Sequence, residues 1–369
     1  MSTTAASPGF LAIGQPVAER LARRMLTEDA APPTILVHGP AGSGKGAFVD
    51  DLLATVLCEA IDPLGRPCNQ CAGCWQARSR THPDLVIASP ARWREDRGTG
   101  ESIVGVARRW LAEVAGAPIA SRWRVIVIEQ ADGANEQVQN ALLKALEEPG
   151  DRQLFILVAD DPRLLLPTIR SRVQSVRVGR VPSAELAEWL VSSAHVTDEQ
   201  AVSLARLADG RVGRAMAFAN APDRVEWRRR TQHELLGLLE RGRADRMASV
   251  RELLDEASQS ALAIAPAVGD DETATRTPTA VQRAAALAIT DAWVDLARDL
   301  AVAAAGAPRL AASSELVPDL ATAAQGRDAR GWADAALAIE RIRDALEENV
   351  SPRLALETAM LAWPEIAPR

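Results

Sequence analysis

The sequence predicts an α/β domain followed by an all-α region, and three observations support this fold class. Short apolar runs alternate with helical or loop segments through the first half of the chain. A glycine-rich loop joins the first of these runs to an amphipathic helix. From about residue 183 onward, apolar residues recur with a helical period only. Because the 369 residues are 47% hydrophobic, the chain can bury the cores of two or three domains.

Four apolar runs are the expected strands, and they span residues 34–38, 84–88, 124–129 and 154–158. Helical or loop segments separate them along the chain. This alternation favours a parallel sheet with helices on both faces. The sheet is therefore expected within residues 1–180.

The loop at residues 39–46 reads Gly-Pro-Ala-Gly-Ser-Gly-Lys-Gly, which is the pattern of a phosphate-binding loop (P-loop) except at its last position. In that pattern, backbone N–H groups and the lysine surround phosphates, and a following Ser or Thr binds Mg²⁺. Glycine replaces that hydroxyl residue here. A glycine-rich turn without a ligand is the alternative interpretation. The candidate nucleotide-binding residues in the loop are Gly39, Gly42, Gly44, Lys45 and Gly46.

The strand at 124–128 ends in Glu129 and Gln130, where an active ATPase carries acidic residues for Mg²⁺ and for the attacking water. Glu129 remains a candidate ligand, although its stem is longer than that of aspartate. Gln130 cannot accept a proton, so the expected general base is missing. Together with Gly46, this departure predicts that ATP or ADP binds without being hydrolysed.

All four cysteines lie in one short segment with the spacing C-x9-C-x2-C-x2-C. In a chain expected to be cytosolic, such clustering favours a closed, structural zinc site with four thiolate ligands. Free thiols or disulfides are one alternative, and an iron–sulfur cluster is another. The candidate zinc ligands are Cys58, Cys68, Cys71 and Cys74.

Composition limits the classes of function. The net charge is −7 and the pI is about 5.4, which argues against a surface dedicated to coating nucleic acid. We see no signal-peptide pattern near the start and no apolar run of about 18 residues, as a membrane span requires. The expected location is the cytoplasm.

Longer stretches of the sequence resemble a known family. Residues 140–149 read Asn-Ala-Leu-Leu-Lys-Ala-Leu-Glu-Glu-Pro, and residues 165–173 read Leu-Leu-Pro-Thr-Ile-Arg-Ser-Arg-Val. Both resemble signature segments of bacterial clamp-loader subunits in the AAA+ superfamily, and the second is most similar to the delta prime branch. His-Pro-Asp at 82–84 and Arg-Leu-Ala-Leu-Glu at 353–357 add to this resemblance.

The resemblance implies three parts: an AAA+ P-loop domain at 1–180 with an inserted zinc module at 58–74, a small helical lid at 181–224, and a helical collar at 225–369. The collar is expected to assemble with other subunits through apolar helix faces such as that around Leu337 and Leu346. An irregular loop is expected at 258–280, and we assign it no role.

The resemblance also implies roles for two arginines. Arg172 corresponds to the arginine finger, which reaches the nucleotide site of a neighbouring subunit. Arg214 lies where the superfamily places its second sensor arginine. For each, an ordinary surface arginine is the alternative. The first sensor position holds Ala159 and Asp160, and an acidic residue there opposes phosphate binding.

These features predict a non-hydrolysing, stator-type subunit of the DNA polymerase III clamp loader, not an enzyme by itself but part of a DNA-directed DNA polymerase holoenzyme. Its implied partners are the gamma/tau motor subunits and the delta subunit. The sliding clamp and primer-template DNA are reached through the complex. The main alternative is an active gamma/tau-type ATPase, and a P-loop kinase of small metabolites is a further one.

Overall fold

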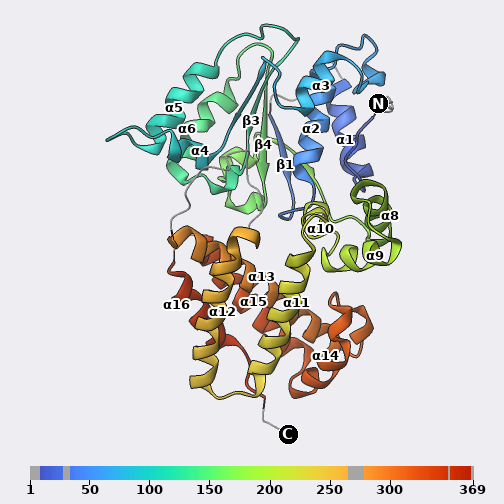
Figure 1. The fold of residues 1–369 in the computed structure, drawn as a ribbon. Coiled ribbons are helices and arrows are strands. Elements are labelled where there is room, and N and C mark those ends of the chain that lie inside the picture. Colours follow the sequence, from blue (N-terminus) through green and yellow to red (C-terminus); the bar gives the residue numbers. More distant parts are fainter. Residues whose placement is uncertain (1–8, 28–33, 265–277, 348–349, 367–369) are drawn as a thin grey trace. The chain divides into compact units, whose positions relative to one another are not determined.

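The computed structural model describes residues 9–27, 34–264, 278–347 and 350–366. The chain forms two compact units, which are considered separately here (Figure 1). The first unit comprises Met1–Trp189 with Gly210–Arg214, and the second comprises Leu190–Asp209 with Ala215–Arg369. The boundaries of the three expected parts, at 180 and 224, stay predictions.

The first unit contains a five-stranded parallel sheet with the order β2-β3-β4-β1-β5. Its strands are β1 (Thr34–His38), β2 (Leu85–Ala88), β3 (Arg124–Ile128), β4 (Gln153–Ala159) and β5 (Gln174–Arg177). The four expected strands are confirmed. The edge strand β5 was not predicted, because only Val176 of its four residues is buried and so it has no apolar run.

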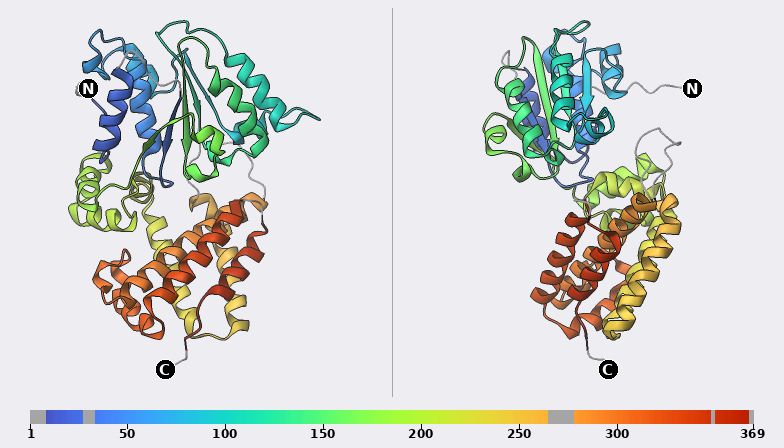
Figure 2. Two further views of the ribbon diagram at one scale, coloured as in Figure 1. Left: turned by 180° about the vertical axis from the view of Figure 1, so that it is seen from behind. Right: turned by 90° about the vertical axis from the view of Figure 1, so that its left-hand side faces the viewer.

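Helices cover both faces of this sheet (Figures 1 and 2). Val125 and Val127 of β3 point into the core shared with one set of helices, whereas Ile126 and Ile128 point into the core on the other face. This alternation is the two-residue period of a strand that is buried on both sides. The first set is α1 (Pro16–Thr27), α2 (Lys45–Val56) and α3 (Ala72–Arg78), and the second is α4 (Pro90–Glu95), α5 (Ile103–Val114), α6 (Glu136–Glu147) and α7 (Pro167–Arg170).

The second unit is helical throughout the residues that the structure describes. Trp293 and Trp363 meet edge to face in its core with ring centroids 5.6 Å apart, and Trp332 packs against the same indole. The helices beyond the sheet are α8 (Ser183–Ala194), α9 (Asp198–Leu207), α10 (Val212–Ala219), α11 (Pro222–Gly237), α12 (Arg243–Ile264), α13 (Pro278–Ala304), α14 (Val317–Ala323), α15 (Ala329–Glu347) and α16 (Pro352–Ala362). The fold class, α/β followed by all-α, is confirmed.

Two expectations for the second half need correction. Helix α12 extends to Ile264 and α13 begins at Pro278, so the irregular loop expected at 258–280 is wrong at both ends. Residues 265–277 lie outside the described residues. Leu346 is fully buried in the helical core, whereas Leu337 is 52% exposed, so only Leu337 is accessible to another subunit. Among the described helices, none combines the length and apolar character that crossing a bilayer requires.

Asp84, immediately before β2, joins the sheet to the loop that leads into β3. Its fully buried carboxylate accepts hydrogen bonds from the backbone N–H groups of Ile119, Ala120 and Ser121 at 2.6–2.8 Å. Burial acts to raise the pKa of this carboxyl, but the backbone hydrogen bonds outweigh burial and lower the pKa. The ionised form therefore stabilises the fold.

We expect Asp84→Asn to lower the free energy of unfolding by about 1.5–3 kcal/mol at pH 7, because hydrogen bonds to a charged group are lost. A depressed pKa contributes stability above the unfolded value of about 3.9, and this contribution disappears as pH falls through the lower folded value. The difference between wild type and variant in urea unfolding should therefore shrink below about pH 4. Asp96→Asn is the control, since its side chain is 58% exposed. Equal effects of the two substitutions would contradict this role.

Candidate phosphate and metal sites

Strand β1 leads into the glycine-rich loop, and the loop geometry requires glycine. Gly39 has φ +152°, and a Cβ there would lie 2.0 Å from the carbonyl oxygen of Val178. Gly44 has φ +96° and precedes α2 without any side-chain cap. The first N–H groups of a helix have no partner within the helix, so the loop presents donors suited to an anion.

Lys45 is almost buried at the start of α2, with 9% of the residue exposed. Its Nζ donates hydrogen bonds to the carbonyl oxygens of Gly39 at 2.8 Å and Pro40 at 3.0 Å, and it forms an ion pair with Asp160. Asp132 Oδ2 accepts a hydrogen bond of 2.8 Å from the backbone N–H of Asp160. Asp160 therefore neutralises the lysine of the loop.

Arg80 brings a second positive charge to the loop. Its Nη1 lies 2.7 Å from Glu129 Oε1, and its Nε lies 3.0 Å from Asp50 Oδ1 on α2. Burial acts to lower the pKa of Arg80, but the charges of Asp50 and Glu129 outweigh burial and raise it, so the guanidinium stays protonated. Gly46 offers no hydroxyl, and Glu129 is already paired. These residues therefore do not fit the usual Mg²⁺ position of a P-loop.

The segment that holds Arg214 lies against the same loop. The backbone N–H of Gly213 donates a 2.9 Å hydrogen bond to the carbonyl oxygen of Gly42. The backbone nitrogen of Arg214 lies 3.6 Å from the position that a Cβ on Gly42 would take. The start of α10 therefore packs against the loop, and the sensor role of Arg214 stays a prediction.

Arg172 is exposed after α7 and contacts residues outside the loop. Its Nη1 donates to the carbonyl oxygen of Thr168 at 2.9 Å, and its Nη2 pairs with Glu147 Oε1 at 2.9 Å. Forty per cent of its side chain remains exposed. Exposed ion pairs contribute at most about 1 kcal/mol, so an anion of another chain can compete for this guanidinium at small cost.

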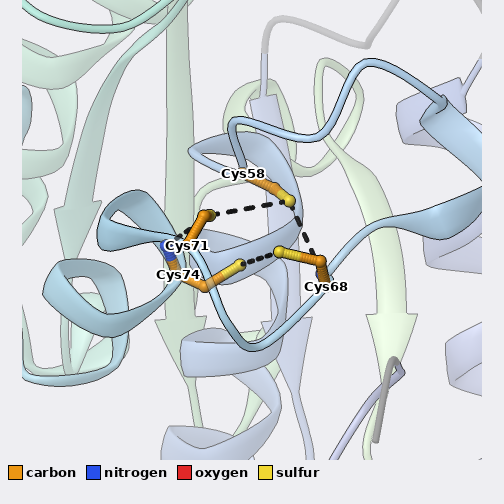
Figure 3. Close-up of side chains that lie close together, drawn as sticks. All are labelled: Cys58, Cys68, Cys71 and Cys74. Atoms are coloured by element: carbon orange, nitrogen blue, oxygen red, sulfur yellow. Dashed lines mark hydrogen bonds between the residues drawn. The ribbon is translucent and has the colours of Figure 1, made fainter.

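The four cysteines converge at the C-terminal end of α2 and the start of α3 (Figure 3). All four Sγ atoms lie within 4.8 Å of one another, and the pairs Cys68–Cys74 and Cys58–Cys71 are 3.9 and 4.0 Å apart. A zinc–sulfur bond of about 2.3 Å implies S–S separations of about 3.8 Å in a tetrahedron. The cluster fits a four-thiolate metal site, and four ligands leave no position open for chemistry.

Backbone N–H groups support the thiolates. Cys58 Sγ accepts from Ala60 and Cys68, and Cys71 Sγ accepts from Glu59 and Cys74, all at 3.3–3.5 Å. Burial raises the pKa of Cys58 and of Cys74. For Cys68, burial acts in the same direction, but backbone hydrogen bonds outweigh it and lower the pKa to about 7. Donors aimed at sulfur are the usual outer shell of a metal site.

Helix α3 connects this cluster to the P-loop helix. Arg78 Nη2 lies 2.7 Å from Asp51 Oδ1, whose fully buried carboxylate also accepts from the backbone N–H groups of Leu11 and Ala12. Arg80 follows two residues later and reaches Asp50. Consecutive carboxylates of α2 are therefore held by two arginines at the end of α3.

Sequence reasoning did not identify Arg80, Asp50 or Asp132 as parts of the site. One signal was present: Arg80 follows the end of a short helix, where a left-handed residue, usually glycine, is common. Only a weak indication in the sequence pointed to the pairing of Lys45 with Asp160. The sequence shows an acidic residue at position 160 but not which cation that residue contacts.

The part of the chain that contains the P-loop and the cysteine cluster is similar to known DNA polymerase III subunits. Residues 14–182 match the family model described as DNA polymerase III, delta subunit. The delta' subunit of DNA polymerase III from Pseudomonas aeruginosa is 32% identical over 174 residues, or 47% of this chain and 50% of the relative. The tau subunit from Bacillus subtilis is 29% identical over 171 residues, or 46% of this chain and 29% of the relative.

A solved DNA polymerase III gamma subunit-related protein from Thermotoga maritima covers 93% of this chain and 97% of its own at 17% identity, with a TM-score of 0.41. The chain spans about half the length of the delta' relatives from Pseudomonas and Escherichia coli. The alignment with the Pseudomonas protein covers less than half of this chain.

Proposed function

We propose, from the match of residues 14–182 to the family described as DNA polymerase III, delta subunit, and from the similarity to delta' relatives, that this protein is a non-hydrolysing delta prime subunit of the clamp loader. In this role it binds beside a gamma/tau motor subunit and the delta subunit. The complex then uses ATP hydrolysed by the motor to load the sliding clamp onto primed DNA. The chain contributes structure and one arginine to that reaction.

The observation that carries this proposal is the state of the two groups needed for hydrolysis. Glu129 is held by Arg80, and Gln130 stands where a general base is required. Glutamine has no basic site that can take a proton from water at neutral pH. A motor subunit needs both groups available, so the same geometry opposes the gamma/tau alternative.

The positive contribution is assigned to Arg172. Its guanidinium is exposed and held near α6 by the weak pair with Glu147. A guanidinium placed against the outer phosphate stabilises the charge that develops during phosphoryl transfer, and related arginines change rates by about 10³–10⁵. In the assembled ring, Arg172 is proposed to exchange Glu147 for the phosphate of the neighbouring subunit.

We expect Arg172→Ala to reduce the clamp- and DNA-stimulated ATPase of a reconstituted loader by at least about tenfold at the affected motor site, because a transition-state contact is lost. The measurement compares complexes of equal composition, verified by size-exclusion chromatography. Arg108→Ala, an exposed arginine of α5, is the matched control and should leave the rate unchanged. Equal rates with Arg172→Ala and Arg108→Ala would remove the assignment.

The cysteine cluster is proposed to hold a structural Zn²⁺ through Cys58, Cys68, Cys71 and Cys74. When bound, zinc supplies a cross-link between the end of α2 and the start of α3. The arginines at the end of α3 would then be held against the P-loop helix through Asp50 and Asp51.

Purified protein should contain about one equivalent of zinc, and Cys68→Ser/Cys71→Ser should lose most of it, because two of four ligands are removed. Metal analysis and the thermal midpoint with and without chelator measure this, with Thr81→Ala as a control in the neighbouring turn. Less than half an equivalent in protein kept reduced would contradict the assignment.

A further inference from the structure

The place that the metal occupies in an active P-loop is taken by a side chain in this protein. Arg80 Nη2 lies 3.9 Å from the position that a Cβ on Gly46 would have, which is the residue that normally carries the metal-binding hydroxyl. The same guanidinium pairs with Glu129, the acidic residue that follows β3. Arg80 therefore lies between the two positions from which Mg²⁺ is usually held.

The backbone at Arg80 is in an unusual conformation. Its φ is +58°, a left-handed geometry that non-glycine residues adopt at an energetic cost. The turn is closed by a 3.1 Å hydrogen bond from the N–H of Arg80 to the carbonyl oxygen of Ala77. Glycine satisfies such a turn without strain. An arginine at this strained position provides a side chain that pairs with Asp50 and Glu129, which glycine would not.

One buried hydroxyl of the loop has no hydrogen-bond partner among the residues that the structure describes. Ser43 is 1% exposed, and among the described residues its hydroxyl has no hydrogen-bond partner. Gly39 and Gly44 hold the backbone in the conformation of a phosphate cradle. A buried hydroxyl without a partner is costly unless a ligand satisfies it.

We propose that Arg80 replaces the divalent cation, so that this P-loop binds the phosphates of a nucleoside di- or triphosphate without metal. This inference rests on the proposed non-hydrolysing function, and it names a metal-free nucleoside di- or triphosphate as the ligand of the P-loop. A guanidinium supplies positive charge and fixed N–H donors to phosphate oxygens, as Mg²⁺ supplies charge and coordination. It does not activate water, which agrees with a site that binds without turnover.

Binding requires Lys45 to exchange Asp160 for phosphate. Asp160 is 56% exposed, so its carboxylate can turn into solvent at small cost. Arg80 keeps Asp50 and Glu129 as partners, and these carboxylates hold the guanidinium in position. A Mg²⁺ ion at the same place would meet the positive charge of Arg80 and would have neither a hydroxyl at residue 46 nor a free Glu129.

The direct test is calorimetric titration of the purified chain with ADP, once in EDTA and once in Mg²⁺. The two dissociation constants should agree within about threefold, and pyrophosphate should compete in both buffers while adenosine does not. Binding at least about tenfold tighter in Mg²⁺ would overturn the proposal. So would the absence of ADP binding in EDTA.

Arg80→Gly removes the guanidinium while preserving the backbone turn, because glycine is the residue best suited to the left-handed conformation. It should remain folded, with a cooperative thermal transition, and weaken ADP binding in EDTA by at least about tenfold, the effect of losing a charge-assisted hydrogen bond. Arg108→Ala should bind as wild type does. Unchanged affinity in Arg80→Gly would contradict the role of this residue.

The double variant Arg80→Gly/Gly46→Ser restores the hydroxyl and frees Glu129. Its ADP binding should become at least about tenfold tighter when EDTA is replaced by Mg²⁺, whereas the wild type does not respond. A double variant whose ADP affinity does not respond to Mg²⁺ would contradict the assignment of the metal position.

The clamp-loader ATPase assay is independent of these binding tests. If the chain supports the loader ATPase but does not bind ADP in EDTA, only this inference is wrong. If the chain binds ADP in EDTA but does not support the loader ATPase, only the proposed function is wrong.

Discussion

The site depends on one electrostatic constraint: positive charge that is largely withdrawn from water must be matched by negative charge. Lys45 and Arg80 lie beside the same loop, and carboxylates of three separate segments meet them. Asp160 follows β4, Glu129 follows β3, and Asp50 belongs to α2. Because the carboxyl ends of parallel strands meet at one edge of a sheet, the fold brings these charges together.

The same constraint links the cysteine cluster to the loop. Helix α3 begins within the cluster and ends at Arg78, and Arg78 and Arg80 pair with neighbouring aspartates of α2. Asp51 is fully buried, so removing its partner would leave an uncompensated charge in the core. A metal held by the four cysteines would therefore be connected to the P-loop helix through α3 and these two ion pairs.

The sequence was sufficient for the elements whose signals are local. Asn135 stands directly before the apolar stripe of α6 and caps this helix by accepting a 2.9 Å hydrogen bond from the N–H of Val138. Four strands were visible as apolar runs, and the cysteine spacing predicted the cluster. Strand β5 was missed because an edge strand with one buried residue has no such run.

The electrostatic partners within the site could not be predicted in the same way. The pairs Arg80–Glu129 and Lys45–Asp160 join residues 49 and 115 positions apart, and the choice of partner depends on tertiary packing. The ends of α12 and α13 are also hard to predict from sequence, because a proline such as Pro278 occurs in irregular chain and is equally favourable in the first turn of a helix.

We propose that this chain keeps a phosphate cradle whose own catalytic groups are disabled. Single-turnover hydrolysis of ATP by the purified protein in Mg²⁺, with the protein in excess over nucleotide, tests it most directly. With disabled catalytic groups, no ADP should form above the level seen with Lys45→Ala. Hydrolysis at about 1 s⁻¹, the low end for phosphotransfer enzymes, that is lost in Lys45→Ala would contradict it.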